Sequence, residues 1–484
     1  MERVFLMKSV AATRGEPESF TTIPKVSMVP GLASKRVLVI AYDFPPRRTS
    51  GVYRVTHLTK YLNGLGWSPT VLTVAARPGD LEDRTLLRDF PSGVRVERAA
   101  DLNISGWENK AAVGIRAAGG LQSHYKDTRQ PLRDRWVRAA GHLVRSTFYF
   151  PDDTVGWVPL ALARAIELHL QQRFDMVYTT SPPRAAPVVG LLLKSLLGIP
   201  WVAEFRDPWY PPSRPWRRRS ERWFLLRILR KADRVVVISK GHKQKLETEF
   251  GVPSGKTVVV SNGFEESDFA PPLASRVPNG SPAAPASKCD FLSPAHFHLS
   301  HFGTVYPGFS GRFFDALREV LEECPDWKNQ IRVNVIGFPD DTIRQVVADG
   351  GLGGTVRVFD FVKHDVAIEA MRASDVLLVF LGGREIARLS GVGKIYDYLR
   401  AGRPVLAVAY EGGTAEIVRE GQAGWVVDPE DTAAIKDVLR NIVQNGRKGN
   451  LPRPANSEFV AQFRYDRLAG KLAEVLNSVV RDGS

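Results

Sequence analysis

Short runs of β-branched and aliphatic residues recur along this chain, and the residues after each run place apolar side chains at helical spacing. The run RVLVIAY (36–42) ends in the loop DFPPRRTSG, after which Val55, Leu58 and Leu62 lie three or four residues apart. PTVLTV (69–74) is the next run. A strand, a helix and a second strand in this order predict a parallel β-sheet covered by helices.

The same pattern continues through two halves of the chain. A stretch rich in Pro, Ser and Ala (271–288) has no periodicity and separates the halves as a linker or a surface insertion. Further strands are predicted at 94–98, 175–180, 201–205, 234–239, 257–261, 299–305, 331–337, 356–361, 375–381, 404–409 and 425–428. The sequence therefore predicts an α/β fold of two successive units, each built on a parallel sheet, with a ligand-binding cleft between them at the carboxyl ends of strands.

The domain limits follow from these patterns. A polar segment over about 105–150 is expected to be helical within the first domain. The expected parts are a loose N-terminal extension (1–35), a first domain (36–270), the linker or insertion (271–290), a second domain (291–450) and a C-terminal helical segment (451–484).

Composition limits the classes of function. With 44% hydrophobic and 24% charged residues the chain has the make-up of a soluble globular protein, and no uninterrupted apolar run is long enough to span a bilayer. Cys289 and Cys324 are the two cysteines, so we expect neither a disulfide framework nor a zinc site, and the reducing cytoplasm is the predicted location. The net charge of +14 predicts an anionic partner: nucleic acid, phospholipid headgroups or a phosphorylated substrate.

Three loops after predicted strands contain glycines that would let a phosphate approach the backbone closely. They are PPRRTSG (45–51), GTVYPGFSGR (303–312) and YEGGT (410–414). Any one of these loops taken alone is better explained as an ordinary turn, whereas three on matching strand ends favour a phosphate site. Because neither GxxxxGK[ST] nor GxGxxG occurs, the common ATPase and dinucleotide-binding interpretations lose their main support.

An ordered set of longer motifs is more specific. It comprises the first strand and helix (37–73), YFPDDTVGW, TTSPPRAAPVVG, IPWVAEFRDPW, ADRVVVISKG, VVVSNGFEESDF, SHFGTVYPG, ASDVLLVF and GKIYDYLRAGRPVL (393–406), the last continuing through EGGTAEIVREGQAGWVVDPED. From about residue 36 to 440, the chain resembles the GT-B glycosyltransferases of the large retaining, family-4-like group, which use nucleotide sugars to build polysaccharides and glycolipids. The resemblance implies two Rossmann-like domains facing across a cleft, with the sugar donor bound mainly by the second.

On the donor side, the resemblance implies that Asp397 accepts hydrogen bonds from the ribose hydroxyls; a solvated helix residue is the alternative. The chain departs from the family pattern at Leu389, where a first Glu is usual, and at Thr304, where cations usually follow the glycine. Lys394, Arg388 and Arg312 are then the candidates for neutralising the diphosphate, and each could equally be a surface charge. Gly303, Thr304, Gly412, Gly413 and Val362 complete the expected donor side.

On the acceptor side, EFRDPW (204–209) ends a strand and should point side chains at the cleft. Arg206 and Asp207 are the candidate catalytic pair, although they could instead pair with each other as scaffolding. Gly51, Ser181, Arg184 and Glu204 complete the expected acceptor side. The resemblance implies no protein nucleophile, and we expect no metal and no cofactor beyond the nucleotide-sugar substrate.

A basic segment, RPWRRRSERWFLLRILRK (214–231), has eight Lys or Arg against one acid, Glu221. Its Trp216 and Trp223 and its arginines would suit the anionic inner face of a membrane and a lipid-linked acceptor, while a plain solvated helix is the alternative. Leu225, Ile228, Leu229 and Ala232 should face the domain core. Two rival functions stay open, a non-catalytic GT-B protein that binds nucleic acid or a partner and a GT-B sugar epimerase, although no nucleic-acid motif is present and nucleic acid is not the expected partner.

Overall fold

The structure is a computed structural model that describes residues 34–49, 51–77, 79–102, 150–209, 215–270, 289, 291–305, 307–337, 341–452 and 457–482. All but the last residues of the expected extension 1–35 lie outside this part. So do the segment 105–150 except Phe150, and the expected linker 271–290 except Cys289.

The first domain is built on a parallel sheet, as predicted. In the described part of the chain this sheet has seven strands in the order β3-β2-β1-β4-β5-β6-β7. The strands are β1 (Lys35–Ala41), β2 (Trp67–Val74), β3 (Arg95–Ala99), β4 (Met176–Ser181), β5 (Trp201–Phe205), β6 (Arg234–Val237) and β7 (Thr257–Val259). Its helices are α1 (Val52–Leu62), α4 (Val158–Gln172), α5 (Ala185–Leu197), α6 (Pro215–Lys231) and α7 (Lys240–Phe250).

The second domain repeats this plan. Its described sheet has six parallel strands in the order β10-β9-β8-β11-β12-β13. The strands are β8 (Phe297–Phe302), β9 (Ile331–Ile336), β10 (Val356–Phe359), β11 (Val376–Leu381), β12 (Val405–Ala409) and β13 (Gly424–Val427). Its helices are α8 (Pro307–Glu323), α9 (Asp341–Asp349), α10 (His364–Ala373), α11 (Arg384–Leu389), α12 (Lys394–Ala401), α13 (Gly413–Glu420) and α14 (Thr432–Arg447).

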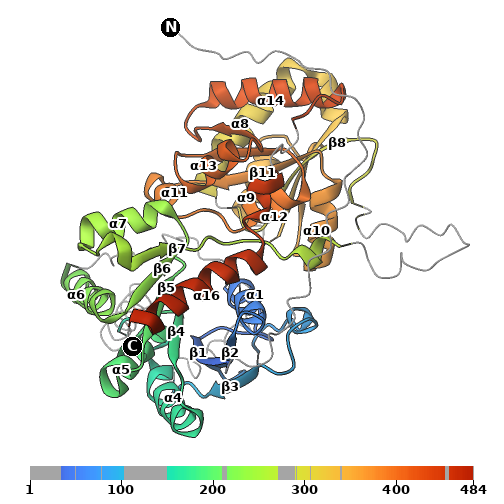
Figure 1. Cartoon of the computed structure of the whole chain (residues 1–484). Helices are drawn as coiled ribbons and strands as arrows, with labels where there is room; N and C mark the ends of the chain where they lie inside the picture. Colours follow the sequence, from blue (N-terminus) through green and yellow to red (C-terminus); the bar gives the residue numbers. More distant parts are fainter. Residues whose placement is uncertain are drawn as a thin grey trace, which may run out of the picture. The chain divides into compact units, whose positions relative to one another are not determined.

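These sheets confirm the predicted α/β class and all thirteen predicted strands, with ends that shift by up to three residues. The strand order changes direction beside β1 in the first sheet and beside β8 in the second, which is the arrangement of Rossmann-like domains. Figure 1 shows helices against both faces of each sheet. Loops that leave the carboxyl ends of neighbouring strands are thereby gathered at one edge of each sheet.

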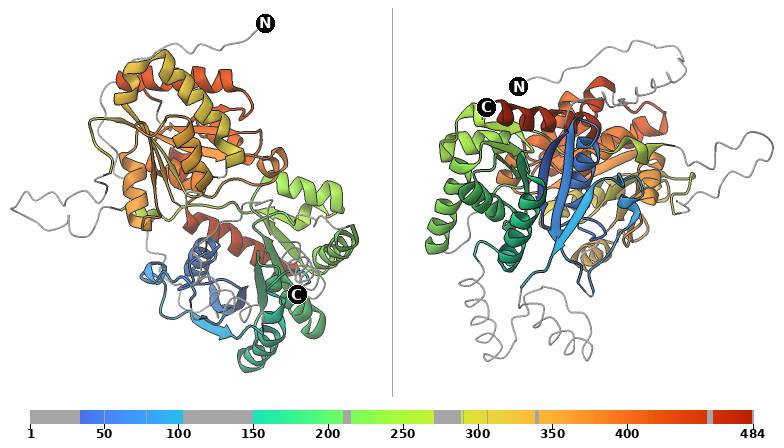
Figure 2. Two further views of the ribbon diagram at one scale, coloured as in Figure 1. Left: turned by 180° about the vertical axis from the view of Figure 1, so that it is seen from behind. Right: turned by 60° about the horizontal axis from the view of Figure 1, so that its bottom comes forward.

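The C-terminal segment consists of α15 (Ser457–Ala461) and α16 (Tyr465–Asp482). The helix α16 returns to the first domain, where Leu468, Leu472 and Leu476 pack in one core cluster with Val39 and Leu58. Figures 1 and 2 show α16 beside α1 in every view. The last helix of the chain therefore completes the core of the first domain.

Buried side chains and a hydrogen bond to the end of β8 fix the helix α12 in the second domain. In α12 the side chains of Ile395, Tyr396, Tyr398 and Leu399 are buried, and the backbone N–H of Phe302 at the end of β8 donates to the Tyr398 hydroxyl at 2.9 Å. The helix ends at Gly402, whose φ of +70° is the left-handed conformation that glycine adopts without strain. The other face of α12 carries the polar side chains of the candidate site.

Candidate functional site

Asp397 lies on this polar face of α12 and is half-buried. Burial raises the pKa of its carboxyl to about 7; nearby His364 lowers it and Asp268 raises it further. No hydrogen bond or ion pair to this carboxylate occurs among the residues that the structure describes. A partly buried carboxylate without a partner is costly unless a ligand donates to it.

His364 and Asp268 stand beside Asp397 as a hydrogen-bonded pair, with 2.9 Å between Nε2 and Oδ2. Burial opposes protonation of His364, but Asp268 and Asp397 together raise its pKa above the usual value. Tyr53 of α1, in the first domain, lies 5.3 Å from the His364 ring. Residues from both domains therefore lie around the Asp397 carboxylate.

Lys394 is three residues before Asp397 and thus on the same side of α12. Burial alone lowers the pKa of its ammonium to about 8. Its Nζ lies 3.1 Å from Nε2 of the buried His301, and a Cβ at Gly303 would come within 2.9 Å of Nζ. The φ of Gly303 is +103°, so glycine is needed there for the backbone as well as for the space.

The remaining expected donor residues occupy different surroundings. Arg312 is exposed and forms an ion pair with Glu430 at 2.9 Å, which favours its surface-charge alternative. The Thr304 carbonyl lies 3.4 Å from His301 Nε2, and Val362 packs on the core of the second domain. The geometry therefore brings Lys394, Asp397 and Gly303 together and leaves Arg312 paired elsewhere.

The loop YEGGT packs against the end of α11 and the residues that follow it. A Cβ on Gly412, whose φ is +151°, would overlap the carbonyl of Ala387, and Gly413 lies against Gly391. Thr414 accepts a hydrogen bond from the backbone N–H of Val392 at 3.1 Å. These glycines therefore let two backbone segments meet just before α12.

Leu389, which stands where the family usually has its first Glu, packs in the interior of this protein. Leu389 is fully buried, and its carbonyl accepts a hydrogen bond from Ser239 Oγ. The same Ser239 caps α7, since its Oγ accepts from the N–H of His242 at 3.0 Å. Gly241 follows, and a Cβ there would overlap the carbonyl of Arg388. The start of α7 in the first domain thus contacts the end of α11 in the second.

Arg206 joins two loops at the carboxyl edge of the first sheet. Its guanidinium donates to the carbonyl of Gly51 at 2.6 Å and to the carbonyl of Pro182, and burial lowers its pKa. A Cβ at Gly51 would collide with this guanidinium. The backbone N–H of Arg206 also donates to the carbonyl of Ser181, while Asp207 is exposed. Arg206 therefore shapes the loops after β1 and β4 through backbone carbonyls.

Glu204 is buried in a network that the sequence did not predict. Its carboxylate accepts from Arg54 Nη2 at 2.6 Å and from the Thr180 hydroxyl at 2.6 Å. Arg54 also donates to the carbonyl of Val260 at 2.8 Å. Burial would raise the pKa of Glu204, but the Arg54 charge lowers it below the usual value. These contacts favour a scaffolding role for Glu204.

A cavity of about 550 Å³ lies beside Arg206 at this edge of the first sheet. Residues 151–154, 182–184, Arg217 and Glu221 line it. The side chain of Glu221 is only 2% exposed and accepts from Arg184 at 2.7 Å, from Arg217 at 2.9 Å and from Trp209 Nε1 at 3.0 Å. The expected acceptor loops PDDTVGW and TSPPR therefore meet around one cavity, whose floor is a buried ion-pair network.

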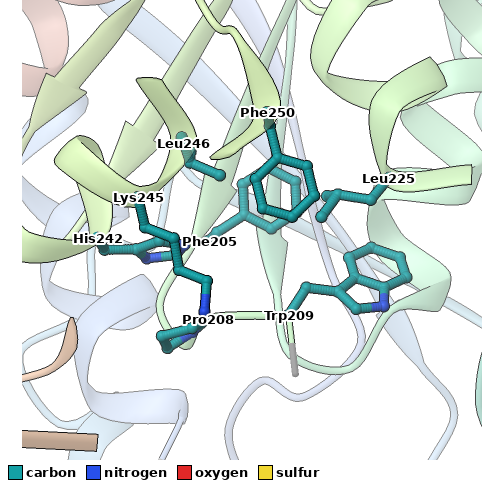
Figure 3. A pocket seen from close by; sticks show the side chains of 8 residues that line it. All are labelled: Phe205, Pro208, Trp209, Leu225, His242, Lys245, Leu246 and Phe250. Atoms are coloured by element: carbon teal, nitrogen blue, oxygen red, sulfur yellow. The ribbon is translucent and has the colours of Figure 1, made fainter. Parts of the chain in front are cut away.

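A second cavity is too small for a ligand. It has about 10 Å³, room for a single water molecule, and is lined mainly by apolar side chains such as Phe205, Trp209 and Phe250 (Figure 3). Figure 3 also shows Lys245 extending past His242 along its rim. Lys245 forms an ion pair with Glu385 of α11 at 2.6 Å, so this region holds the two domains in contact.

Several residues at the site carried no sequence signal that we recognised. Arg54, Asp268 and His364 have ordinary surroundings in the sequence, and their roles depend on partners far along the chain. His301 could have been noticed, because a histidine inside a buried strand next to a glycine loop needs a polar partner. No group of three or more His, Cys, Asp or Glu suited to a metal ion occurs in the described ranges.

Both halves of the chain match known families. Residues 51–263 match the model of a glycosyl transferase 4-like domain, and residues 305–445 match that of glycosyl transferases group 1. The chain belongs to the GT-B glycosyltransferases. The resemblance found in the sequence motifs and the fold expected from it are confirmed.

Curated relatives are distant. A D-inositol 3-phosphate glycosyltransferase of Streptomyces coelicolor is 25% identical over 271 residues, which cover 52% of this chain and 57% of that protein. A phosphatidyl-myo-inositol mannosyltransferase of Mycobacterium leprae is 26% identical over 171 residues, 35% of this chain and 43% of the relative. The chain spans about half the length of the curated relatives it matches.

Solved structures agree in fold. A glycosyltransferase from Rickettsia africae is 15% identical with a TM-score of 0.61, and the match covers 92% of this chain and 99% of that one. An Anabaena protein crystallised with UDP-glucose is 17% identical with a TM-score of 0.58 and the same coverage. At these identities the likeness shows the two-domain fold and leaves the substrates to be inferred from this chain's own residues.

Proposed function

We propose that this GT-B protein transfers a sugar from a nucleotide-sugar donor to a saccharide or lipid-linked acceptor, with retention of the anomeric configuration, in the synthesis of cell-surface polysaccharide or glycolipid. One observation carries the proposal: Asp397, whose carboxylate has no partner among the described residues, and Lys394, whose ammonium is desolvated, share the first turn and face of α12. A nucleoside diphosphate offers the two groups that match them, vicinal ribose hydroxyls and an anionic diphosphate.

The proposed reaction requires stabilisation of a leaving group. When the sugar–phosphate bond breaks, negative charge develops on the departing diphosphate and positive charge on the anomeric carbon. We assign the stabilisation of the diphosphate charge to the Lys394 ammonium and the backbone at Gly303, which lie close together. With retention, the acceptor hydroxyl attacks from the face that the diphosphate leaves, so we assign no protein nucleophile.

We assign the acceptor to the cavity around Glu221 in the first domain. Two arginines and three carboxylates line it, and the arginines are paired with Glu221. Polar side chains held in place by such pairs can donate to and accept from several sugar hydroxyls at once. Relatives are named for acceptors that contain inositol, a polyhydroxylated ring of this kind.

Binding of nucleotides tests the proposal directly. The full chain should be stabilised against heat by one of UDP, GDP and ADP more than by the others, because the second domain must recognise one base. The matching nucleotide sugars are then tested as donors by product analysis with saccharide and lipid-linked acceptors. Equal effects of all three nucleotides, or their complete displacement by single-stranded nucleic acid at moderate salt, would instead support a nucleic-acid-binding protein.

We further propose that the enzyme works at the inner face of a membrane through α6. Leu225, Ile228, Leu229 and Ala232 are buried as predicted, while Trp223 is 61% exposed and Arg218, Arg219, Arg222, Arg227, Arg230 and Lys231 are exposed. Arg214 and the side chain of Trp216 lie outside the described part of the chain. No helix in the described ranges has the length and apolar character that a transmembrane span requires. An exposed tryptophan among several cations suits reversible binding to anionic lipid.

A further inference from the structure

The Lys394 ammonium is held by an uncharged partner. No carboxylate lies within ion-pair distance of it in the described part of the chain, and its one hydrogen-bond partner there is His301 Nε2 at 3.1 Å. A lysine that is buried without an acid keeps its positive charge uncompensated. Such a group costs free energy in the free protein and recovers it when an anion binds.

The tautomer of His301 follows from its other contacts. Its ring is fully buried, and Nδ1 lies 3.0 Å from the carbonyl of Leu378, which can only accept. Nε2 lies 3.4 Å from the carbonyl of Thr304, but its shorter contact, at 3.1 Å, is with the Lys394 ammonium, which can only donate. Nδ1 therefore carries the proton, and Nε2 presents a lone pair to Lys394. Burial and the adjacent Lys394 hold the pKa of His301 well below its usual value, so the imidazole stays neutral.

A neutral imidazole can orient the Lys394 ammonium without neutralising its charge, whereas a carboxylate at this position would neutralise it. It fixes the direction of the lysine by accepting one of its three N–H bonds, and it leaves the positive charge available to a ligand. Ring packing holds the imidazole itself, since the centroid of Phe380 lies 5.1 Å from that of His301. Gly303 has no Cβ, and one there would lie 2.9 Å from the ammonium nitrogen.

We propose that His301 is a positioning residue: its neutral Nε2 aims the Lys394 ammonium across Gly303 at the anionic diphosphate of the ligand. The identity of that anion rests on the proposed function. The role of His301 rests on the contacts of Leu378, His301 and Lys394 alone.

Two polar substitutions separate the two hydrogen bonds of His301. In His301→Asn the shorter amide can still donate to the Leu378 carbonyl but does not reach Lys394, whereas His301→Gln places an amide oxygen near the position of Nε2. His298→Asn is the matched control, because His298 is also buried in β8 but contacts Ser293 and Asn334 instead. Thermal unfolding of each variant verifies that it is folded.

Affinities are measured by calorimetry for UDP, GDP and ADP, for the corresponding nucleosides and for inorganic pyrophosphate. We expect His301→Asn to weaken binding of the preferred nucleoside diphosphate and of pyrophosphate by about tenfold or more, with little change for the nucleoside. His301→Gln should recover most of the affinity, and His298→Asn should bind like the wild type. Because His301 acts through Lys394, adding His301→Asn to Lys394→Met should cause no further loss.

Each negative outcome has a distinct meaning. Wild-type affinity in folded His301→Asn, or losses that multiply in the double variant, would overturn the role of His301 and leave the proposed function intact. If the wild type binds pyrophosphate in a manner that requires both residues but prefers no nucleotide, the positioning role stands and the nucleotide-sugar donor is wrong. If the asparagine variant does not fold, a glutamine variant that binds tenfold more weakly than the wild type would equally overturn the proposal.

Discussion

Replacing Asp397 with asparagine should make the free protein more stable and donor binding weaker. The carboxyl has its pKa raised from 3.8 to about 7, mainly by burial, so in the folded chain near pH 8 it is ionised in surroundings that disfavour the charge. At 1.36 kcal/mol for each pKa unit the cost has a ceiling of about 4 kcal/mol. Because the side chain is only half-buried and solvent screens part of the charge, we expect Asp397→Asn to stabilise the protein by about 1–2 kcal/mol.

The pH dependence gives the sign of this effect. A carboxyl whose pKa is raised by folding costs nothing below its unfolded pKa near 4, and the cost grows as the pH rises to about 7 and is constant above that. The asparagine variant should therefore unfold at a higher temperature than the wild type at pH 8, and the difference should shrink towards pH 4.5. Thermal unfolding without nucleotide at a series of pH values measures it.

Donor binding should change in the opposite direction. Loss of a charged acceptor for the ribose hydroxyls costs roughly 1.5–3 kcal/mol, a factor of about 10–150 in affinity for the preferred nucleotide. The wild-type affinity should also fall when the pH drops below 7 as Asp397 takes up its proton, whereas the variant lacks this step. Asp397→Glu, which keeps the charge, should retain more affinity than the asparagine variant. An asparagine variant that is less stable than the wild type at pH 8, or that binds nucleotide equally well, would refute the reasoning.

Three further expectations concern the metal, the membrane and the acceptor. Transfer should survive thorough chelation if, as we propose, Lys394 and backbone groups neutralise the diphosphate; complete loss with EDTA that manganese restores would contradict this. Replacing Arg218, Arg219 and Trp223 with serine should reduce co-sedimentation with anionic vesicles at low salt, at about 1 kcal/mol for each cation, and equal pelleting of both proteins would leave α6 an ordinary surface helix. Glu221→Gln should destabilise the first domain by about 3 kcal/mol and raise KM for the acceptor more than for the donor, and an unchanged acceptor KM would place the acceptor elsewhere.

The strands were predictable because their signal is local. A buried parallel strand is typically an apolar run, and β1, β11 and β12 have nearly continuous ones, whereas β3 (RVERA) at the edge of the first sheet does not. The strand ends were harder to predict where the last apolar or polar residues belong to the next helix or loop. The strand expected over 234–239 ends at Val237, because Ser239 caps α7, and the one expected over 356–361 ends at Phe359, leaving Phe361 exposed with Arg48 3.7 Å from its ring.

Contacts between residues far apart in the chain could not be predicted in the same way. The C-terminal segment was correctly expected to be helical. An amphipathic pattern shows that one helix face is buried but does not indicate which domain buries it, and α16 packs on the first domain. Glu204 was expected to face the acceptor because it ends a strand. Its neighbour in space is Arg54, 150 residues earlier in the chain, and no sequence spacing indicated that pair.

The two departures from the family pattern have a common physical consequence at α12. A Glu at position 389 would place a carboxylate where Leu389 is fully buried against the start of α7, and that carboxylate would need a cation to compensate it. The chain has an apolar side chain there, and it also lacks the usual cations after Gly303. In the described part of the chain Asp397 has no hydrogen-bond or ion-pair partner and Lys394 has no acidic one, so both groups gain a partner only when a ligand contributes hydroxyl donors and an anion. A site of this kind should therefore bind a nucleoside diphosphate much more tightly than either the nucleoside or pyrophosphate, since each of these satisfies only one of the two groups.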